Sequence, residues 1–355
     1  MYFYLIIAFL LMFFSFVEIL SNRNNDNRVN VIQLVLLLLL IIIVSIRSVG
    51  FDYDSYESAY NQLHVSDISD IFSDIQFEPG FILLNKFSPS FIVLIIFMGL
   101  ITLLIKNKLI LNISPFPIVS LMILFLGYYL NFEMGQIRQA LAMSITLFSI
   151  QYYTDKKKFL FFVLIAILFH YSALIFLLVL IIPTKIKSWY FYVIGLFIAI
   201  ILFFNIEPVF MKLSDYLPGF SGAKMIGYYD DEKGKLGISI PILFSRFILL
   251  SLFFSLKSKI IELRKPIYEY FFNIYFLSLF IYITFAFFPQ ISGRGGVYFS
   301  IFDILLIPII LKAIRNTYYR IAVLFFFTII YLIMFVSFLN KWGVSFIPYK
   351  SWISI

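Results

Sequence analysis

The chain has 355 residues, of which 62% are hydrophobic and only 13% charged. Its mean hydropathy of +1.00 is far above that of soluble domains, which are about 45–50% apolar. This composition excludes a soluble globular fold and predicts an all-α polytopic integral membrane protein. The continuously apolar run 34–44 also excludes an outer-membrane barrel, whose strands alternate apolar and polar residues.

The charge and the scarce residue types narrow the function further. A formal charge of +8 would suggest nucleic acid as a partner of a soluble protein, but in a membrane protein basic residues set the orientation, so we expect no nucleic acid. Cysteine is absent and histidine occurs only twice. Disulfides and thiolate nucleophiles are therefore excluded, and we expect neither a metal nor a cofactor.

Ten apolar runs are long enough to cross the ~30 Å hydrocarbon layer as helices. The first run lacks a basic n-region and a small-residue cleavage site, so we interpret it as a retained span rather than a signal peptide. No internal repeat or low-complexity linker divides the chain, which predicts a single transmembrane domain over residues 1–355. The ten predicted spans are 2–20, 29–46, 90–105, 115–130, 137–153, 188–204, 238–256, 267–288, 297–311 and 320–339.

One further apolar run, 159–182, carries His170 at its middle, where a helix facing lipid would place no imidazole. If this run crosses once, 14 basic residues fall inside and 12 outside, whereas if it enters and returns the counts are 16 and 10. The positive-inside rule favours the second arrangement, and each half is too short to span. We therefore predict a re-entrant hairpin over 159–182 that enters from the cytoplasm and has His170 at its tip, near the membrane centre.

With this topology both termini lie outside, together with two long loops, 47–88 and 205–237. Twelve of the 19 acidic residues fall in these two loops. Any chemistry must therefore use the spans and the outer loops.

Three arginines are predicted at the outer ends of spans, where basic residues are unusual. They are Arg47, Arg138 and Arg294. A planar guanidinium fork binds phosphate groups bidentately, so the three are candidate diphosphate ligands. The alternative is that each arginine snorkels or forms an ion pair.

Arg294 lies in the glycine-rich stretch 292–296, where backbone amides can approach a ligand closely and a helix N-terminus follows. This favours phosphate or diphosphate as the ligand. The alternative is a plain flexible turn.

The first outer loop interleaves acids with tyrosines, a composition typical of sugar binding, because carboxylates accept hydrogen bonds from hydroxyls and aromatic faces cover the ring. Tyr53 and Tyr56 are the aromatic sugar-binding candidates, and Gln139, which follows Arg138, is grouped with them. Asp52 or Glu78 could act as the general base, with Asp52 ranked first. The alternative is a solvated acidic loop.

His170 is a third catalytic candidate, because an ionisable residue within the bilayer is functional by default. The predicted topology places it too deep to work with the carboxylates of the outer loop, unless the cavity reaches the membrane centre. Its alternative role is a structural hydrogen bond to a neighbouring helix.

Several short motifs, in one order along nearly the whole chain, resemble the EpsG family of Wzy-type polysaccharide polymerases. They are Arg47-x-x-Gly50-x-Asp52-x-x-x-Tyr56, Phe77-Glu78-Pro79-Gly80-Phe81, Gly135-x-x-Arg138-Gln139-x-Leu141-Ala142, Ala166-x-x-x-His170-Tyr171-Ser172-Ala173 and Ile347-Pro348-Tyr349.

This resemblance implies polymerisation of O-antigen or exopolysaccharide repeat units at the periplasmic or outer face of the cytoplasmic membrane. It also implies an undecaprenyl-diphosphate-linked oligosaccharide as substrate and a fold similar to GT-C glycosyltransferases. The implied partners are membrane lipid and a chain-length regulator and flippase of the same pathway.

Two other functions stay open. A flippase for lipid-linked oligosaccharides would also have many spans and intramembrane charge, although the sequence shows no inverted repeat. A membrane sugar O-acyltransferase would use His170 as its base.

Overall fold

The computed structural model describes residues 1–21, 27–65, 77–215 and 237–354. The regular secondary structure of these residues is helical, and the only extended pairing among them is an isolated antiparallel bridge between Arg47 and Ser351. The chain divides into two compact units: unit 1 comprises Met1–Leu177 and Ile307–Ile355, and unit 2 comprises Leu178–Leu306. The all-α fold class is thereby confirmed.

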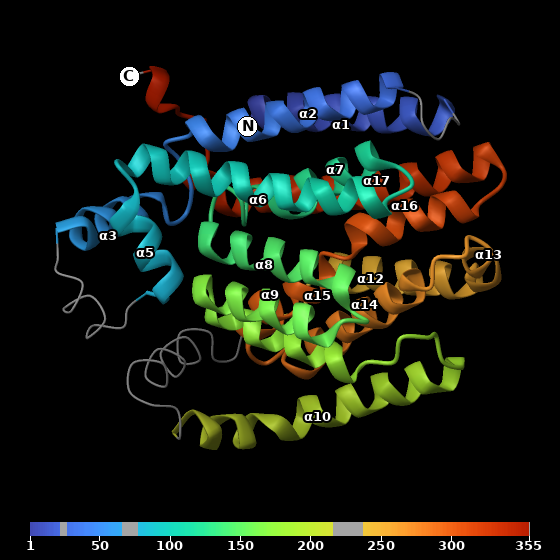
Figure 1. The fold of residues 1–355 in the computed structure, drawn as a ribbon. Helices are drawn as coiled ribbons and strands as arrows, with labels where there is room; N and C mark the ends of the chain where they lie inside the picture. Colours follow the sequence, from blue (N-terminus) through green and yellow to red (C-terminus); the bar gives the residue numbers. More distant parts are fainter. Residues whose placement is uncertain (22–26, 66–76, 216–236, 355) are drawn as a thin grey trace. The chain divides into compact units, whose positions relative to one another are not determined.

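Unit 1 is built around α8, which packs against α6 and α9 (Figure 1). Small side chains allow this close packing, because Ala140, Ala142 and Ser144 of α8 are all fully buried. Its helices are α1 (Tyr2–Ser21), α2 (Asn27–Ile46), α3 (Tyr53–Val65), α5 (Pro79–Phe87), α6 (Phe91–Ile113), α7 (Pro117–Leu124), the π-helical turn η1 (Phe125–Tyr129), α8 (Ile137–Ser149), η2 (Ile150–Tyr152), α9 (Lys156–Phe169), α17 (Thr317–Trp342), η5 (Gly343–Ser345) and η6 (Trp352–Ser354).

Unit 2 is organised around α14, which contacts both α10 and α12. Two elements cross the unit boundary: the 3₁₀ helix η3 (Tyr171–Ile181) and α16 (Asp303–Ala313). The elements of unit 2 are α10 (Trp189–Asp215), α12 (Ile240–Ser255), α13 (Lys257–Ile261), α14 (Ile267–Thr284), η4 (Ile291–Gly295) and α15 (Val297–Ser300).

Several helices are long and apolar enough to cross a membrane, which supports a multi-pass membrane protein. A sixth span is obtained if the pair Ile291–Ser300 and Asp303–Ala313, bent by 43°, is counted as one. Shorter apolar helices occupy other predicted spans, including Asn30–Ile46 and Ile240–Ser255. The count of ten therefore stays a prediction. The five long helices are Tyr2–Ser21, Phe91–Ile113, Trp189–Val209, Ile267–Thr284 and Thr317–Ser345.

The end of α6 differs from the predicted span 90–105. The Ser90 hydroxyl accepts a hydrogen bond from the Val93 N–H at 3.3 Å and caps the start of the helix. The helix then continues to Ile113 and ends at Ser114, because the residue directly before a proline, here Pro115, disfavours helical conformation. Lys106, which follows the predicted span, therefore lies within the helix.

The run 159–182 reverses direction at His170. α9 ends at Phe169, and His170 has extended backbone angles (φ −158°, ψ 117°). The rings of Phe159 and Phe176 stack at 5.9 Å between centroids, which requires the chain to fold back between them. That this reversal enters the membrane from the cytoplasm stays a prediction.

The predicted outer loops contain helices. The loop 47–88 carries α3 and α5, and its residues 66–76 lie outside the described residues. In the loop 205–237, α10 continues to Asp215, and residues 216–236 lie outside the described residues.

Candidate functional site

Three helix ends of unit 1 meet at one polar cluster. Glu78 directly precedes α5 and has extended backbone angles (φ −70°, ψ 145°), because Pro79 starts that helix. Arg138 is the second residue of α8, and His170 joins α9 to η3. The structure thus brings together two predicted catalytic residues and one predicted diphosphate ligand that lie far apart in the sequence.

Glu78 is the centre of this cluster. Its Oε2 accepts a hydrogen bond from Nη1 of Arg138. Its Oε1 accepts a hydrogen bond from the Tyr171 N–H at 3.4 Å and lies 3.7 Å from Nδ1 of His170. The tip residue of the predicted hairpin and Glu78 are therefore neighbours, so the site reaches His170.

The cluster is open on one side. The Glu78 side chain is 6% exposed, whereas the side chains of Arg138 and His170 are 20% and 23% exposed. The carboxylate is therefore shielded, but the imidazole and the guanidinium are accessible to a molecule outside.

Gly80 explains how α5 comes so close to α9. A Cβ atom at this position would lie 2.7 Å from the carbonyl oxygen of Leu168 and 3.0 Å from the ring of Phe169. Any larger residue would force the two helices apart. The Pro79-Gly80 pair therefore starts α5 and also permits the approach that places Glu78 beside His170.

Aromatic side chains surround the Arg138 guanidinium. Its Cζ lies 5.7 Å from the ring centroid of Tyr56, 5.0 Å from that of Phe77 and 5.4 Å from that of Phe81. Such faces attract a cation and exclude water. The Nε atom of Arg138 is buried and has no hydrogen-bond partner among the described residues.

Tyr56 links the cluster to Asp52. Burial raises the pKa of the Tyr56 phenol above its ordinary value, and the positive charge of Arg138 opposes this increase. The carboxylates of Asp52 and Glu78 add to the raised pKa. Asp52 remains a candidate base.

Ser172 adds a hydroxyl to the histidine. Its Oγ lies 3.1 Å from Nδ1 of His170, and its backbone N–H lies 3.3 Å from the same atom. Nδ1 of His170 therefore faces the Ser172 hydroxyl and N–H and lies near the Glu78 carboxylate. An imidazole can accept or donate a proton near neutral pH.

Arg47 lies in a different environment from Arg138. Its side chain is 1% exposed and donates to the carbonyl oxygens of Val49 at 3.1 Å and Glu133 at 3.4 Å. Gly50 is required beside it, because the φ of this residue is +147° and a Cβ would lie 2.2 Å from the Met134 carbonyl. These contacts are those of an arginine that organises the protein interior.

The C-terminal segment covers Arg47. The Ser48 N–H donates to the Lys350 carbonyl at 2.9 Å, and the Tyr349 hydroxyl donates to the Ile43 carbonyl at 2.8 Å. Tyr53 lies on another side of Arg47, whose Cζ is 5.7 Å from the tyrosine ring centroid. The two sugar-binding candidates of α3 therefore face different arginines.

Gln139 and Arg294 complete the predicted set. The Gln139 side chain is fully buried in unit 1. Arg294 lies in unit 2, within the π-helical turn η4, and is partly exposed. A shared diphosphate site between Arg294 and Arg138 stays a prediction. Among the described residues, no group of three His, Cys, Asp or Glu side chains is placed to hold a metal ion.

Sequence reasoning missed a second ion pair in unit 1. The ammonium group of Lys106 lies 2.5 Å from Oε1 of Glu133, and both side chains are fully buried. The same ammonium donates to the Ser144 hydroxyl at 2.8 Å and the Ala140 carbonyl at 3.3 Å. One signal could have found this pair, because Glu133 is a lone acid between two apolar runs.

The comparisons with known proteins agree with the motif pattern. The sequence profile of the EpsG family matches residues 30–351, which is most of the chain and includes every residue of the cluster. Comparison of the chain with curated proteins and with solved structures gives no match.

Proposed function

The chain belongs to the EpsG family, which is associated with exopolysaccharide biosynthesis, and we propose that it is a polysaccharide polymerase. It transfers a glycan from an undecaprenyl-diphosphate donor to a lipid-linked repeat unit at the outer face of the cytoplasmic membrane. About ten spans and a re-entrant hairpin in a GT-C-like arrangement would enclose the site. A flippase that supplies repeat units and a chain-length regulator would act beside it.

The observation that supports this proposal best is the contact of Glu78 with both His170 and Arg138. Glycosyl transfer needs a base for the acceptor hydroxyl and a positive charge for the leaving group. The cluster offers both in one partly open place. A positioned base typically contributes ~10²–10⁴-fold to the rate.

In the proposed reaction, the acceptor oxygen attacks the anomeric carbon of the donor glycan, and the bond from this carbon to the diphosphate oxygen breaks. The diphosphate leaves with the bonding electrons, and the acceptor proton passes to His170. Glu78 orients the imidazole and stabilises its protonated form, as a carboxylate does beside a catalytic histidine.

Arg138 and Arg294 are the proposed ligands of the leaving diphosphate, since fixed guanidinium groups stabilise charge as it develops. Arg138 already bonds Glu78 through Nη1, and its side chain is 20% exposed. Tyr53, Tyr56 and Gln139 are the proposed sugar contacts, and Arg47 supports the loop that carries the two tyrosines.

Purified full-length protein in lipid nanodiscs, supplied with lipid-linked repeat units and no acyl donor, tests the proposal. We expect a ladder of polymer on a carbohydrate gel, which a flippase or an O-acyltransferase would not produce. If a correctly folded preparation leaves the single repeat units unchanged, the protein is not a polymerase.

The base assignment has its own comparison. Asp52→Asn preserves shape and removes basicity, as does Glu78→Gln. If Glu78→Gln abolishes polymer and Asp52→Asn retains it, the proton passes through the Glu78–His170 pair. The reverse result would assign the base to Asp52.

A further inference from the structure

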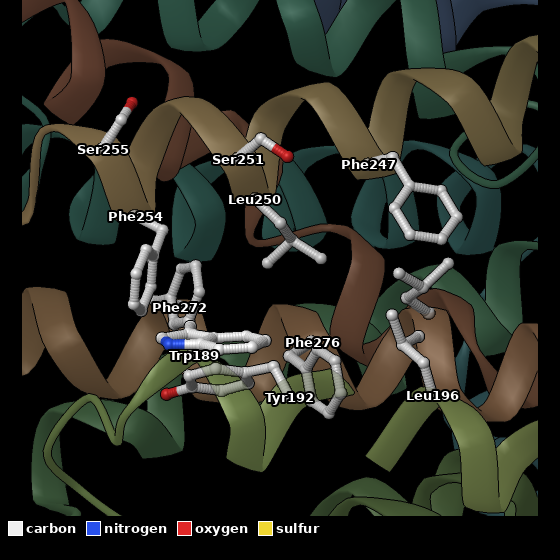
Figure 2. A pocket seen from close by; sticks show the side chains of 11 residues that line it. Trp189, Tyr192, Leu196, Phe247, Leu250, Ser251, Phe254, Ser255, Phe272 and Phe276 are labelled. Carbon is white, nitrogen blue, oxygen red and sulfur yellow. The ribbon is translucent and has the colours of Figure 1, made fainter. Parts of the chain in front are cut away.

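Unit 2 contains a cavity of about 360 Å³ between α10, α12 and α14 (Figure 2). Its walls are aromatic and aliphatic, and the polar lining groups include the hydroxyls of Ser251 and Ser255. Tyr192 is at the centre of one wall, with ring centroids 5.1 Å from Phe272 and 5.0 Å from Phe276. A lining of this kind fits a hydrocarbon chain and has little to offer a polar ligand.

One end of the cavity is strongly basic. Trp189, which lines the cavity, lies two residues after Lys187 and four after Lys185, and both lysines are exposed. On the α12 side, Lys257 lies two residues after Ser255, and its Nζ donates to the Ile186 carbonyl at 3.3 Å. This hydrogen bond holds the two basic segments together at the same end of the cavity.

The charge at this end is far from balanced. Within 182–188 and 256–269 the chain has six basic and two acidic residues. One of the two acids, Glu269, accepts a hydrogen bond at Oε2 from the Ile186 N–H at 3.0 Å. The six basic residues are Lys185, Lys187, Lys257, Lys259, Arg264 and Lys265.

Trp189 marks the boundary between the apolar and charged parts. Its side chain lines the cavity although the residue is 63% exposed. Tryptophan with one apolar and one wet side is typical of the membrane–water interface. The basic residues beside it indicate the cytoplasmic interface, where anionic lipid headgroups attract lysine and arginine.

We propose that this cavity binds one acyl chain of an anionic phospholipid of the cytoplasmic leaflet, with the lipid phosphate at Lys185 and Lys187. This lipid site goes beyond the polymerase reaction. The basic end adjoins the first residues of α14, whereas Arg294 follows the last residues of α14. An 18-residue helix is about 27 Å long, so the lipid site is distinct from the arginine proposed for the donor diphosphate.

Photolabelling tests the headgroup. The full chain is placed in nanodiscs with a phosphatidylglycerol that carries a diazirine in its acyl chain, or with the matching phosphatidylcholine. We expect phosphatidylglycerol to label the helices around the cavity about tenfold more strongly. Equal labelling by the two lipids, or labels outside 189–196, 247–255 and 272–279, would overturn the proposal.

Charge variants sharpen this test. Lys185→Gln with Lys187→Gln is expected to lower phosphatidylglycerol labelling about tenfold. The control, Lys156→Gln with Lys157→Gln, removes two exposed lysines from α9 and is expected to leave labelling unchanged. An equal loss in both double variants would mean that only general surface charge attracts the lipid.

A cavity-filling variant tests the acyl chain. Ser251→Trp is expected to abolish labelling, whereas Ser258→Trp, at an exposed serine outside the cavity lining, is expected to retain it. Persistent labelling of Ser251→Trp would contradict the assignment. Displacement of phosphatidylglycerol by an equimolar amount of undecaprenyl phosphate would overturn it as well, since the cavity would then hold the lipid carrier.

Discussion

Two of the ion pairs in unit 1 differ in their access to the outside. Glu78 and Arg138 lie beside an imidazole that is 23% exposed, whereas Lys106 and Glu133 are both 0% exposed. The first pair touches groups that could meet a substrate, and the second touches a serine hydroxyl and a backbone carbonyl. One ion pair therefore lies in the partly open candidate site, and the other lies in the closed interior of the unit.

Burial, not charge, is what distinguishes the two pairs. The closed pair joins α6 to the turn before α8, and Lys106 also donates to two residues of α8. The partly open pair lies beside His170, which is 23% exposed. We therefore expect changes at the open pair to affect polymerisation and changes at the closed pair to affect stability.

The largest expected effect is a loss of polymerisation rate in the variant His170→Gln. Loss of the proposed base should lower the rate by about 10²–10⁴-fold, measured as polymer formed by the purified protein. His64→Gln is a matched control, because the chain has two histidines and His64 is exposed on α3 and stacks on Tyr60 at 5.1 Å. Equal activity of both variants would make His170 a structural residue.

The next effect is on stability, at the closed pair. Lys106→Met leaves the Glu133 carboxylate buried without its cation, and breaking such a pair costs about 3–5 kcal/mol. We expect a clear fall in the Tm of the protein in detergent. Adding Glu133→Leu should recover most of this loss, because no buried charge remains. A Tm like that of the original protein in the single variant would show that the pair contributes little.

Gly80→Ala should have a smaller effect. Its Cβ would overlap the Leu168 carbonyl, and the required movement of α5 should cost about 1–3 kcal/mol and reduce polymer formation by separating Glu78 from His170. For the thermal measurement, Gly293→Ala is the control, since its Cβ would meet nothing within 4 Å. Similar Tm values for the two variants would refute the close approach.

Arg138→Lys should have the smallest effect. Lysine keeps the charge and loses the planar fork, so we expect about a tenfold lower rate of polymerisation with a normal fold. Arg315→Lys, at an exposed position of unit 1, should be neutral. If both lysine variants polymerise at the original rate, the guanidinium geometry of Arg138 is not used.

Much of the fold could be predicted because an apolar helix is recognised from the hydropathy of consecutive residues. The predicted span 2–20 matches α1 (Tyr2–Ser21), and both the predicted span 267–288 and α14 begin at Ile267. Lys106 shows where this approach fails. A lysine ends an apolar window in the sequence. Its desolvation cost is offset, however, when a carboxylate such as that of Glu133 comes from elsewhere in the chain.

The candidate site was predictable residue by residue but not as a cluster. The motif order identified Glu78, Arg138 and His170 separately. Their contact depends on the approach of α5 to α9 at Gly80, which is a tertiary feature that local pattern does not encode. The neighbourhood of His170 and Glu78 could not be read from the sequence for the same reason, and the depth of His170 in the membrane stays a prediction.

A double-mutant cycle tests the central claim, that Glu78 and His170 act as one unit. Polymerisation rates are measured for Glu78→Gln, His170→Gln and the double variant in the same nanodiscs. Residues that act together show strongly non-additive losses, so the double variant should be no slower than the slower single variant. If the two losses multiply instead, the residues act independently and the proposed carboxylate–imidazole pair is contradicted.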